Sequence, residues 1–242
     1  MKKVFSIVLV IMLAFAFGCA KTTGDSDLPS APIASAAVTE SIPSQSTFKS
    51  TYKTFGPHFQ AWLNSKGYSF GDGGFGGYRT NAAPAASKRV VIFIHGNSSR
   101  AHGGGSDSYG WYNTYKILRD NGWNNSELYA VNYGYESALM SGNNDHSSTN
   151  VNRVKDFINA VYAYVGNKKV TVVAHSLGVT ISRKAMKDGN LYSKVETFIA
   201  IAGGNRGLPT CGSVTSYYTY VQIAYTPTCS SSTGFLYPPS GH

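Results

Sequence analysis

Four unbroken apolar runs of strand length constrain the fold of this chain more than any other feature of its sequence. They are RVVIFIH (residues 89–95), ELYAVNY (127–133), KKVTVVAH (168–175) and VETFIAIAGG (195–204). A strand with one face in water alternates apolar and polar residues, whereas a strand buried on both faces needs no polar positions. The runs therefore predict a parallel sheet that is covered by helices on both faces.

Helical patterns lie between these runs. From residue 150 to 165, apolar side chains recur at three- and four-residue steps and so share one helix face, with Ser148 or Thr149 placed as the N-cap. We expect two more helices, over Trp111–Asn121 before Gly122 and over Leu177–Lys187 before Gly189. The alternation of strands and helices predicts an α/β fold with right-handed crossovers.

The N-terminus has the features of an export signal. Lys2 and Lys3 precede an apolar run over residues 4–17, which is short for a membrane span, and small residues follow. We therefore expect residues 1–18 to be a signal peptide. The stretch AFGCA resembles a lipobox that would lipidate Cys19 and anchor the protein to a membrane, but ordinary cleavage after Ala20 is equally compatible with it.

Composition divides the remainder of the chain. Residues 19–48 are rich in Ser, Thr, Ala and Pro without a helical or strand period, which predicts a flexible tether. Residues 49–242 are long enough for one domain with a sizeable core. The expected protein is exported, either secreted or a lipoprotein of the outer membrane or cell surface, and monomeric.

Charge and cysteine content narrow the choice of partners. The net charge of +9 falls to +7 without residues 1–18, yet the basic residues are scattered singly or in pairs, so no nucleic-acid partner is expected. Cys211 and Cys229 form an even pair, which predicts one disulfide in an oxidising compartment and no metal site.

The glycine-rich segments 71–78 and 102–110 match no phosphate-binding motif and are expected to be surface loops.

One segment carries the pattern of a nucleophilic serine. In Ala174-His175-Ser176-Leu177-Gly178, small residues lie two positions before and two positions after the serine, as a tight strand-to-helix turn requires. An apolar strand precedes this segment and an amphipathic helix follows it. Such a turn would raise the Ser176 hydroxyl at the helix N-terminus, where the N–H of Leu177 faces a developing oxyanion.

A second segment supplies a matching donor. His95-Gly96-Asn97 follows the first apolar run directly, and in this architecture the loop after an early strand provides the second oxyanion N–H. We expect that donor to be the N–H of Asn97, with His95 and Gly96 shaping the loop and with His175 and Gly178 supporting the serine turn.

These segments resemble a known family. VVIFIHGN, NDHSSTNVNRVKDFINAVYAYVGNKKVTVVAHSLGV and FIAIAGGNRGL are similar to the class 2 lipase group of α/β-hydrolases, and especially to exported bacterial depolymerases of amorphous poly(3-hydroxybutyrate). The resemblance implies an α/β-hydrolase fold and ester hydrolysis through an acyl-enzyme. It also implies Ser176 as nucleophile, the N–H groups of Asn97 and Leu177 as oxyanion hole, and no metal or cofactor.

The acid and base of a catalytic triad are not identifiable. In this fold they follow the serine, but only Asp188, Glu196 and the terminal His242 do so here. Asp188 ends a helix and Glu196 starts a strand at the wrong edge of the sheet. Among the histidines before Ser176, His102 is the one that could replace the missing catalytic base. His146 is instead expected to make a local hydrogen bond. The simplest interpretation is a hydrolase domain that lacks its last strands.

Three hypotheses for the function remain. The first is a serine lipase or esterase that acts on lipid or short-chain acyl esters. The second is an extracellular polyhydroxyalkanoate depolymerase, whose polyester substrate would also fit an apolar cleft. The third is a non-catalytic envelope protein that keeps the hydrolase scaffold without a complete triad.

Overall fold

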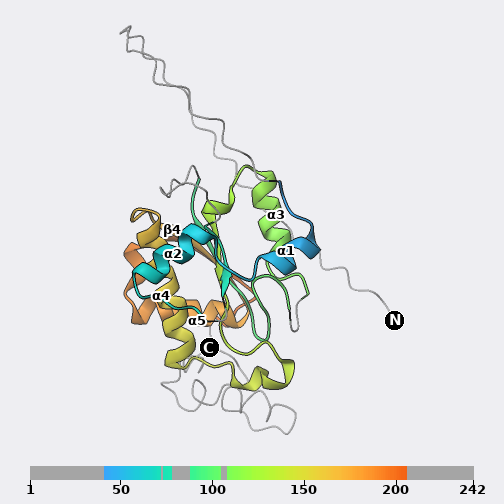
Figure 1. Ribbon diagram of the computed structural model, residues 1–242. Helices are drawn as coiled ribbons and strands as arrows, with labels where there is room; N and C mark the ends of the chain where they lie inside the picture. The colour runs from blue at the N-terminus through green and yellow to red at the C-terminus, as the bar shows by residue number, and fades with distance from the viewer. Residues whose placement is uncertain (1–40, 72, 78–87, 105–107, 206–242) are drawn as a thin grey trace, which may run out of the picture. The chain divides into compact units, whose positions relative to one another are not determined.

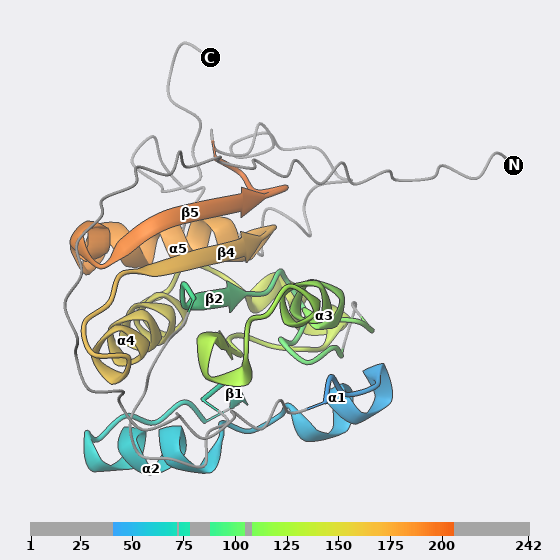
Figure 2. The same cartoon turned by 90° about the horizontal axis from the view of Figure 1, so that it is seen from above.

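A five-stranded, mostly parallel sheet forms the centre of the protein. The computed structural model describes residues 41–71, 73–77, 88–104 and 108–205. The strands are β1 (Gly74–Phe75), β2 (Val91–Ile94), β3 (Leu128–Val131), β4 (Val170–His175) and β5 (Val195–Ile201), in the order β1-β3-β2-β4-β5. β1 pairs antiparallel with β3, and the other four strands are parallel. Figure 2 shows β2, β4 and β5 side by side with their arrowheads in one direction.

Helices connect these strands. The α-helices are α1 (Gln45–Thr51), α2 (Pro57–Ser65), α3 (Tyr112–Asp120), α4 (Ser148–Tyr164) and α5 (Leu177–Asp188). Short 3₁₀ helices are η1 (Asn125–Glu127), η2 (Ala138–Asn143) and η3 (Leu191–Ser193). Gly122 follows α3 with a φ of +85° and Gly189 is the C-cap of α5, so both predicted helix ends are confirmed.

The sheet separates two apolar clusters. Successive strand residues point to opposite faces, so Ile92 and Ile94 pack with α2, α4 and α5, while Val91 and Phe93 pack with α1 and α3. Figure 1 shows the two groups of helices on opposite sides of the strands. Both faces of β2 and β3 are therefore buried, which explains why their sequences show no polar alternation. The predicted α/β fold is confirmed.

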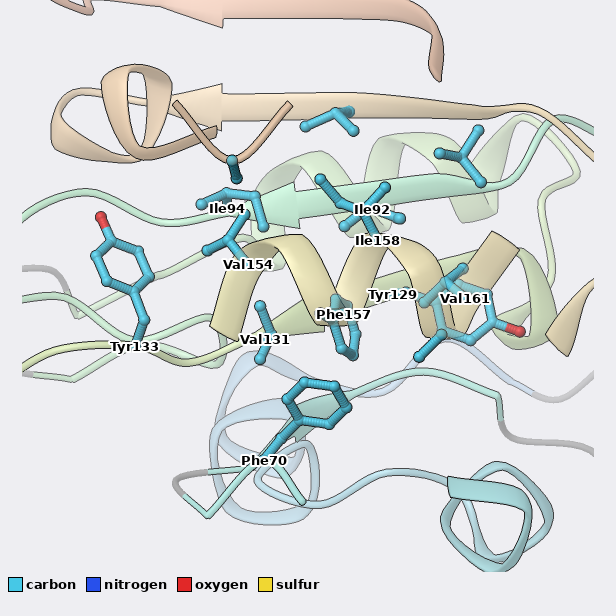
Figure 3. Close-up of a cluster of buried hydrophobic side chains, with 14 of the residues drawn as sticks. Phe70, Ile92, Ile94, Tyr129, Val131, Tyr133, Val154, Phe157, Ile158 and Val161 are labelled. Atoms are coloured by element: carbon cyan, nitrogen blue, oxygen red, sulfur yellow. The ribbon is translucent and has the colours of Figure 1, made fainter. Parts of the chain in front are cut away.

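The larger cluster is built around α4. Its predicted apolar face is fully buried, and Phe157 on that face lies edge-on to Phe70, with ring centroids 5.2 Å apart. Figure 3 shows Phe157, Val154, Ile158 and Val161 of α4 facing Ile92 and Val131 of the sheet. This packing holds α4 against the strands that lead to the loops described below.

Three local predictions differ from the structure. The segment 71–78 is not simply a surface loop, because Gly74–Phe75 forms β1 and Phe75 is buried against Phe48 and Phe93. The expected tether boundary at residue 48 falls inside α1, which begins after its N-cap Ser44 and buries Phe48. The N-cap of α4 is Ser147, one residue before the expected positions, and its side chain makes no capping hydrogen bond.

Several predictions fall outside the described residues. These are the signal peptide over 1–18, Cys19, most of the tether, the Cys211–Cys229 disulfide and His242. Within the described ranges, no helix has the length and apolar character that a membrane span requires.

Candidate active site

Ser176 lies at the turn from β4 to α5, as the sequence motif predicts. It is the N-cap of α5, and its backbone has φ 53° and ψ −124°, a region that residues other than glycine rarely occupy. The turn is held because the Ser176 N–H donates to the Ile201 carbonyl oxygen of β5 at 2.9 Å and the Val179 N–H donates to the Ser176 carbonyl oxygen at 3.0 Å. Ser176 is half-buried, at the carboxyl edge of the sheet.

Two glycines allow the end of β2 to approach this turn. A Cβ on Gly178 would lie 2.3 Å from the His95 carbonyl oxygen and 2.7 Å from that of Ile94. A Cβ on Gly96 would lie 3.1 Å from the Ser176 Cβ and 3.0 Å from Nδ1 of His175. The first turn of α5 therefore packs directly on the β2 backbone, and the Gly96 main chain lies beside the serine.

His95 fixes the orientation of the next peptide group. The Tyr133 N–H donates to its Nε2 at 3.1 Å, so Nδ1 carries the proton and donates to the Gly96 carbonyl oxygen at 2.8 Å. The C=O and N–H of a trans peptide point in opposite directions, so the N–H of Asn97 points away from the His95 ring. Burial lowers the pKa of His95 to about 3, which keeps the imidazole neutral in this role.

The loop after β2 (residues 96–100, here the β2 loop) is bonded to the segment after β3 (residues 132–144, the β3 loop). Asn144 donates from Nδ2 to Oδ1 of Asn97 at 2.7 Å, and the Ser98 hydroxyl donates to the Ser137 carbonyl oxygen at 3.3 Å. The Arg100 guanidinium donates to the carbonyl oxygens of Tyr133 and Gly134, both at 3.2 Å. The two loops thus form one hydrogen-bonded unit.

A second buried hydrogen bond, between His146 and Thr180, lies at the first turn of α5. The Thr180 hydroxyl donates to the Leu177 carbonyl oxygen at 3.0 Å and lies 2.7 Å from Nε2 of His146, which is therefore the donor to it. The partners are 34 residues apart, so the expectation of a local hydrogen bond for His146 is wrong. The bond depends on the packing of α4 against α5, which brings His146, two residues before α4, next to α5.

The structure also places the remaining titratable candidates. His58 bonds the Tyr164 hydroxyl at 2.6 Å, and His175 is exposed beside Ser176. Burial, with added repulsion from Lys53, lowers the pKa of His102 to about 4. In the described part of the chain, none of these histidines hydrogen-bonds the Ser176 hydroxyl.

The two acids after the serine lie away from it. Glu196 is at the start of β5 in an ion pair with Arg89, while Ser176 is bonded to the other end of that strand. Asp188 is at the end of α5, bonded to Lys184 at 2.7 Å. The expectation that neither carboxylate reaches the serine is therefore confirmed. No group of three possible metal ligands occurs within the described ranges.

Sequence reasoning missed Asn144, Arg100 and Thr180. Asn144 is the first residue of a segment that resembles the family, but the resemblance gives it no role, and Asn144 and Thr180 reach partners 47 and 34 residues away. Position was a further signal, because Arg100 and Asn144 lie in segments that follow predicted strands of one sheet.

Comparison with known proteins identifies the family. Residues 88–238 match the family model for lipase (class 2). Among solved structures, the chain is similar to Bacillus licheniformis lipase BlEst2 in its mature form, with 20% identity, a TM-score of 0.41, and coverage of 55% of this chain and 47% of that one. The propeptide form of that lipase gives 20% identity, a TM-score of 0.39, and coverage of 50% and 23%.

A fungal enzyme gives a similar result. Aspergillus fumigatus lipase B is 21% identical, with a TM-score of 0.37 and coverage of 50% of this chain and 25% of that one. The chain thus matches less than half the length of each of these solved lipases. The family match covers well over half of the present sequence, from three residues before β2 to beyond β5. This chain belongs to the class 2 lipase family.

Proposed function

We propose that this protein is a serine carboxylic-ester hydrolase that acts through an acyl-enzyme. The observation that carries the proposal is the strained backbone of Ser176, at φ 53° and ψ −124°, between β4 and α5. Strain of this kind costs on the order of 1–3 kcal/mol and persists where the surrounding structure enforces it. Here it presents the hydroxyl at a helix N-terminus beside the backbone of Gly96.

The proposed chemistry follows from these positions. Ser176 Oγ attacks the ester carbonyl carbon, and the carbonyl oxygen becomes an oxyanion that accepts hydrogen bonds from the N–H groups of Asn97 and Leu177. The ester C–O bond then breaks, and the alcohol leaves with the proton that the Ser176 hydroxyl has lost. Water hydrolyses the acyl-enzyme to the free acid and returns a proton to Ser176 Oγ. The α5 N-terminus adds favourable partial positive charge at the oxyanion.

Apolar side chains near the site favour a substrate with an apolar acyl part. Tyr135 and Leu139 of the β3 loop expose 52% and 86% of their surface, and Met140 is also exposed. This loop is bonded to Asn97 and Ser98, so these side chains belong to the same hydrogen-bonded unit as the proposed oxyanion donor. Lipids, short-chain acyl esters and aliphatic polyesters all supply such a surface.

The test combines covalent labelling with turnover. The full chain is treated with a fluorophosphonate and assayed on p-nitrophenyl butyrate, a tributyrin emulsion and amorphous poly(3-hydroxybutyrate) particles. We expect labelling at Ser176 and ester turnover, and the loss of both in Ser176→Ala, by several orders of magnitude for turnover. Ser193→Ala, at an exposed serine of η3, is the matched control.

The outcomes separate the three hypotheses. Release of 3-hydroxybutyrate from the particles at a rate that exceeds tributyrin hydrolysis would assign the polyester as substrate. Faster hydrolysis of tributyrin would assign lipid or acyl esters. Ester binding that persists in Ser176→Ala, without labelling or turnover in the wild type, would refute the proposal in favour of a non-catalytic scaffold.

A further inference from the structure

We infer that Asn144 is a positioning residue for the reaction, because its side-chain amide holds Asn97 in the orientation that directs the Asn97 N–H at the oxyanion. This inference rests on the proposed function. Asn144 lies between η2 and α4, at the first residue of a segment that resembles the family, and the resemblance gives it no role. It is 1% exposed, and its amide connects the β2 loop to the β3 loop.

The Asn144 side chain uses both its donor and its acceptor atoms. Nδ2 donates to Oδ1 of Asn97 at 2.7 Å and to the Tyr135 carbonyl oxygen at 2.9 Å, while Oδ1 accepts from the Tyr135 N–H at 2.6 Å. Only an amide combines two N–H donors with one carbonyl acceptor in this arrangement. An aspartate would keep the acceptor and lose both donors, and an alanine would lose all three bonds.

The β2 loop needs such a restraint because its backbone is strained. Ser98, the residue after Asn97, has a φ of 52°, in the left-handed region that residues with a Cβ avoid. A strained turn relaxes unless its surroundings hold it. His95 holds the Gly96–Asn97 peptide from the β2 side, and Asn144 holds the Asn97 side chain from the β3 side. Asn97 is therefore fixed from two directions, one residue after the Gly96 main chain that lies beside Ser176.

The restraint matters because an oxyanion donor acts only when it is correctly placed. Loss of one donor costs about 10²–10³ in rate, and a misplacement of about 1 Å can cost 10²-fold. Every residue except proline has a backbone N–H, so changing the Asn97 side chain leaves the donor itself in place. The contribution of the Asn97–Asn144 bond can therefore be measured separately from the donor.

The experiment is a double-mutant cycle on the full chain. Steady-state kcat and KM on p-nitrophenyl butyrate and the thermal midpoint are measured for Asn97→Ala, Asn144→Ala and the double variant. We expect each single variant to lose about 10- to 10²-fold in kcat, with KM within about twofold. The double variant should lose no more than the more affected single variant, because both changes remove the same bond. Asn143→Ala, at the exposed neighbouring amide, is the control and should keep the wild-type kcat.

Several outcomes would overturn the inference. If the losses in kcat multiply in the double variant, Asn144 acts independently of Asn97. If Asn144→Ala lowers the thermal midpoint and leaves kcat unchanged, the residue serves only the β3 loop. If Asn144→Ala does not fold, the Asn97→Ala variant tests the inference by itself, because it removes the acceptor of the Asn144 bond and leaves the Asn144–Tyr135 bonds intact. An unchanged kcat in Asn97→Ala would then refute the positioning role of Asn144. Absence of Ser176 labelling in the wild type would instead refute the proposed function.

Discussion

Nδ1 of His95 lies 2.8 Å from the carbonyl oxygen of Gly96, and this bond sets the direction of the peptide that carries the Asn97 N–H. The imidazole is held in turn by the Tyr133 N–H at 3.1 Å and by stacking on the Tyr133 ring, with centroids 4.4 Å apart. One buried, neutral side chain thus joins the end of β2 to the loop after β3.

The first prediction tests the hydrogen bond that Nδ1 of His95 donates to Gly96 separately from the bond that Nε2 accepts. In His95→Asn, the amide Nδ2 can replace Nδ1 as donor to Gly96, whereas His95→Leu leaves the Gly96 carbonyl and the Tyr133 N–H without this partner. Each buried group without a partner costs about 1–3 kcal/mol. We therefore expect His95→Asn to keep a clearly larger share of kcat than His95→Leu. Equal kcat values for the two variants on p-nitrophenyl butyrate would contradict this role.

The second prediction concerns the pH dependence of stability. Burial lowers the pKa of His95 to about 3 and that of His146 to about 4, both below the ordinary histidine value of 6.5. Between these folded values and 6.5, the unfolded chain binds protons that the folded chain does not. The free energy of unfolding should therefore be greatest above pH 6.5 and fall as the pH approaches 4, by about 1.4 kcal/mol per pH unit for each such histidine.

Urea unfolding at several pH values measures this slope. His146→Gln is the informative variant, because the glutamine Nε2 can still donate to the Thr180 hydroxyl while the titrating group is gone. We expect a shallower decline below pH 6.5 for this variant than for the wild type. Identical slopes would show that His146 does not titrate differently in the folded and unfolded chains.

The strands and the serine turn were predictable because their signals are local. Burial on both faces removes polar residues from β2 and β3, and the tight turn at Ser176 requires Gly178 within the same short segment. β1 was missed because a two-residue strand among glycines leaves no apolar run. α1 was missed because its Ser- and Thr-rich composition obscures the i, i+4 pair of Phe48 and Tyr52.

The hydrogen bonds that hold the loops and the helix turn around the site were not predictable, for a different reason. Asn144 meets Asn97 only because β3 lies beside β2, and His146 meets Thr180 only because α4 packs on α5. Each contact depends on strand order and helix packing, which no single segment encodes. The pattern of the sequence therefore identifies the nucleophile candidate, while the residues that hold its surroundings require the folded chain.

The third prediction tests the close approach of α5 to β2. In Gly178→Ala the new methyl group would meet the carbonyl oxygens of His95 and Ile94 at 2.3 and 2.7 Å, and backbone atoms of a central strand cannot move aside cheaply. We expect a loss of at least about 2 kcal/mol in the free energy of unfolding and a large loss of Ser176 labelling. Gly71→Ala is the control, because no described residue lies within 4 Å of the new Cβ. Similar stability for the two variants would contradict the tight packing.

The last prediction concerns α1, which the sequence assigned in part to a flexible tether. Phe48 is fully buried, stacked on Tyr52 at 4.4 Å and tilted against Tyr115 at 4.8 Å, with Phe75 of β1 edge-on at 5.3 Å. Truncation of a buried phenylalanine typically costs about 3–5 kcal/mol, so Phe48→Ala should destabilise the whole domain by that amount. Lys49→Ala, at the exposed next position, should stay within about 0.5 kcal/mol of the wild type.

Urea unfolding followed by tryptophan fluorescence measures both variants, because Trp111 packs in the same cluster as Phe48. A single cooperative transition that moves to lower urea in Phe48→Ala would establish α1 as part of the domain that carries Ser176. If Phe48→Ala instead costs less than about 1 kcal/mol, α1 contributes little to the fold and the tether extends beyond residue 48, as its composition suggests.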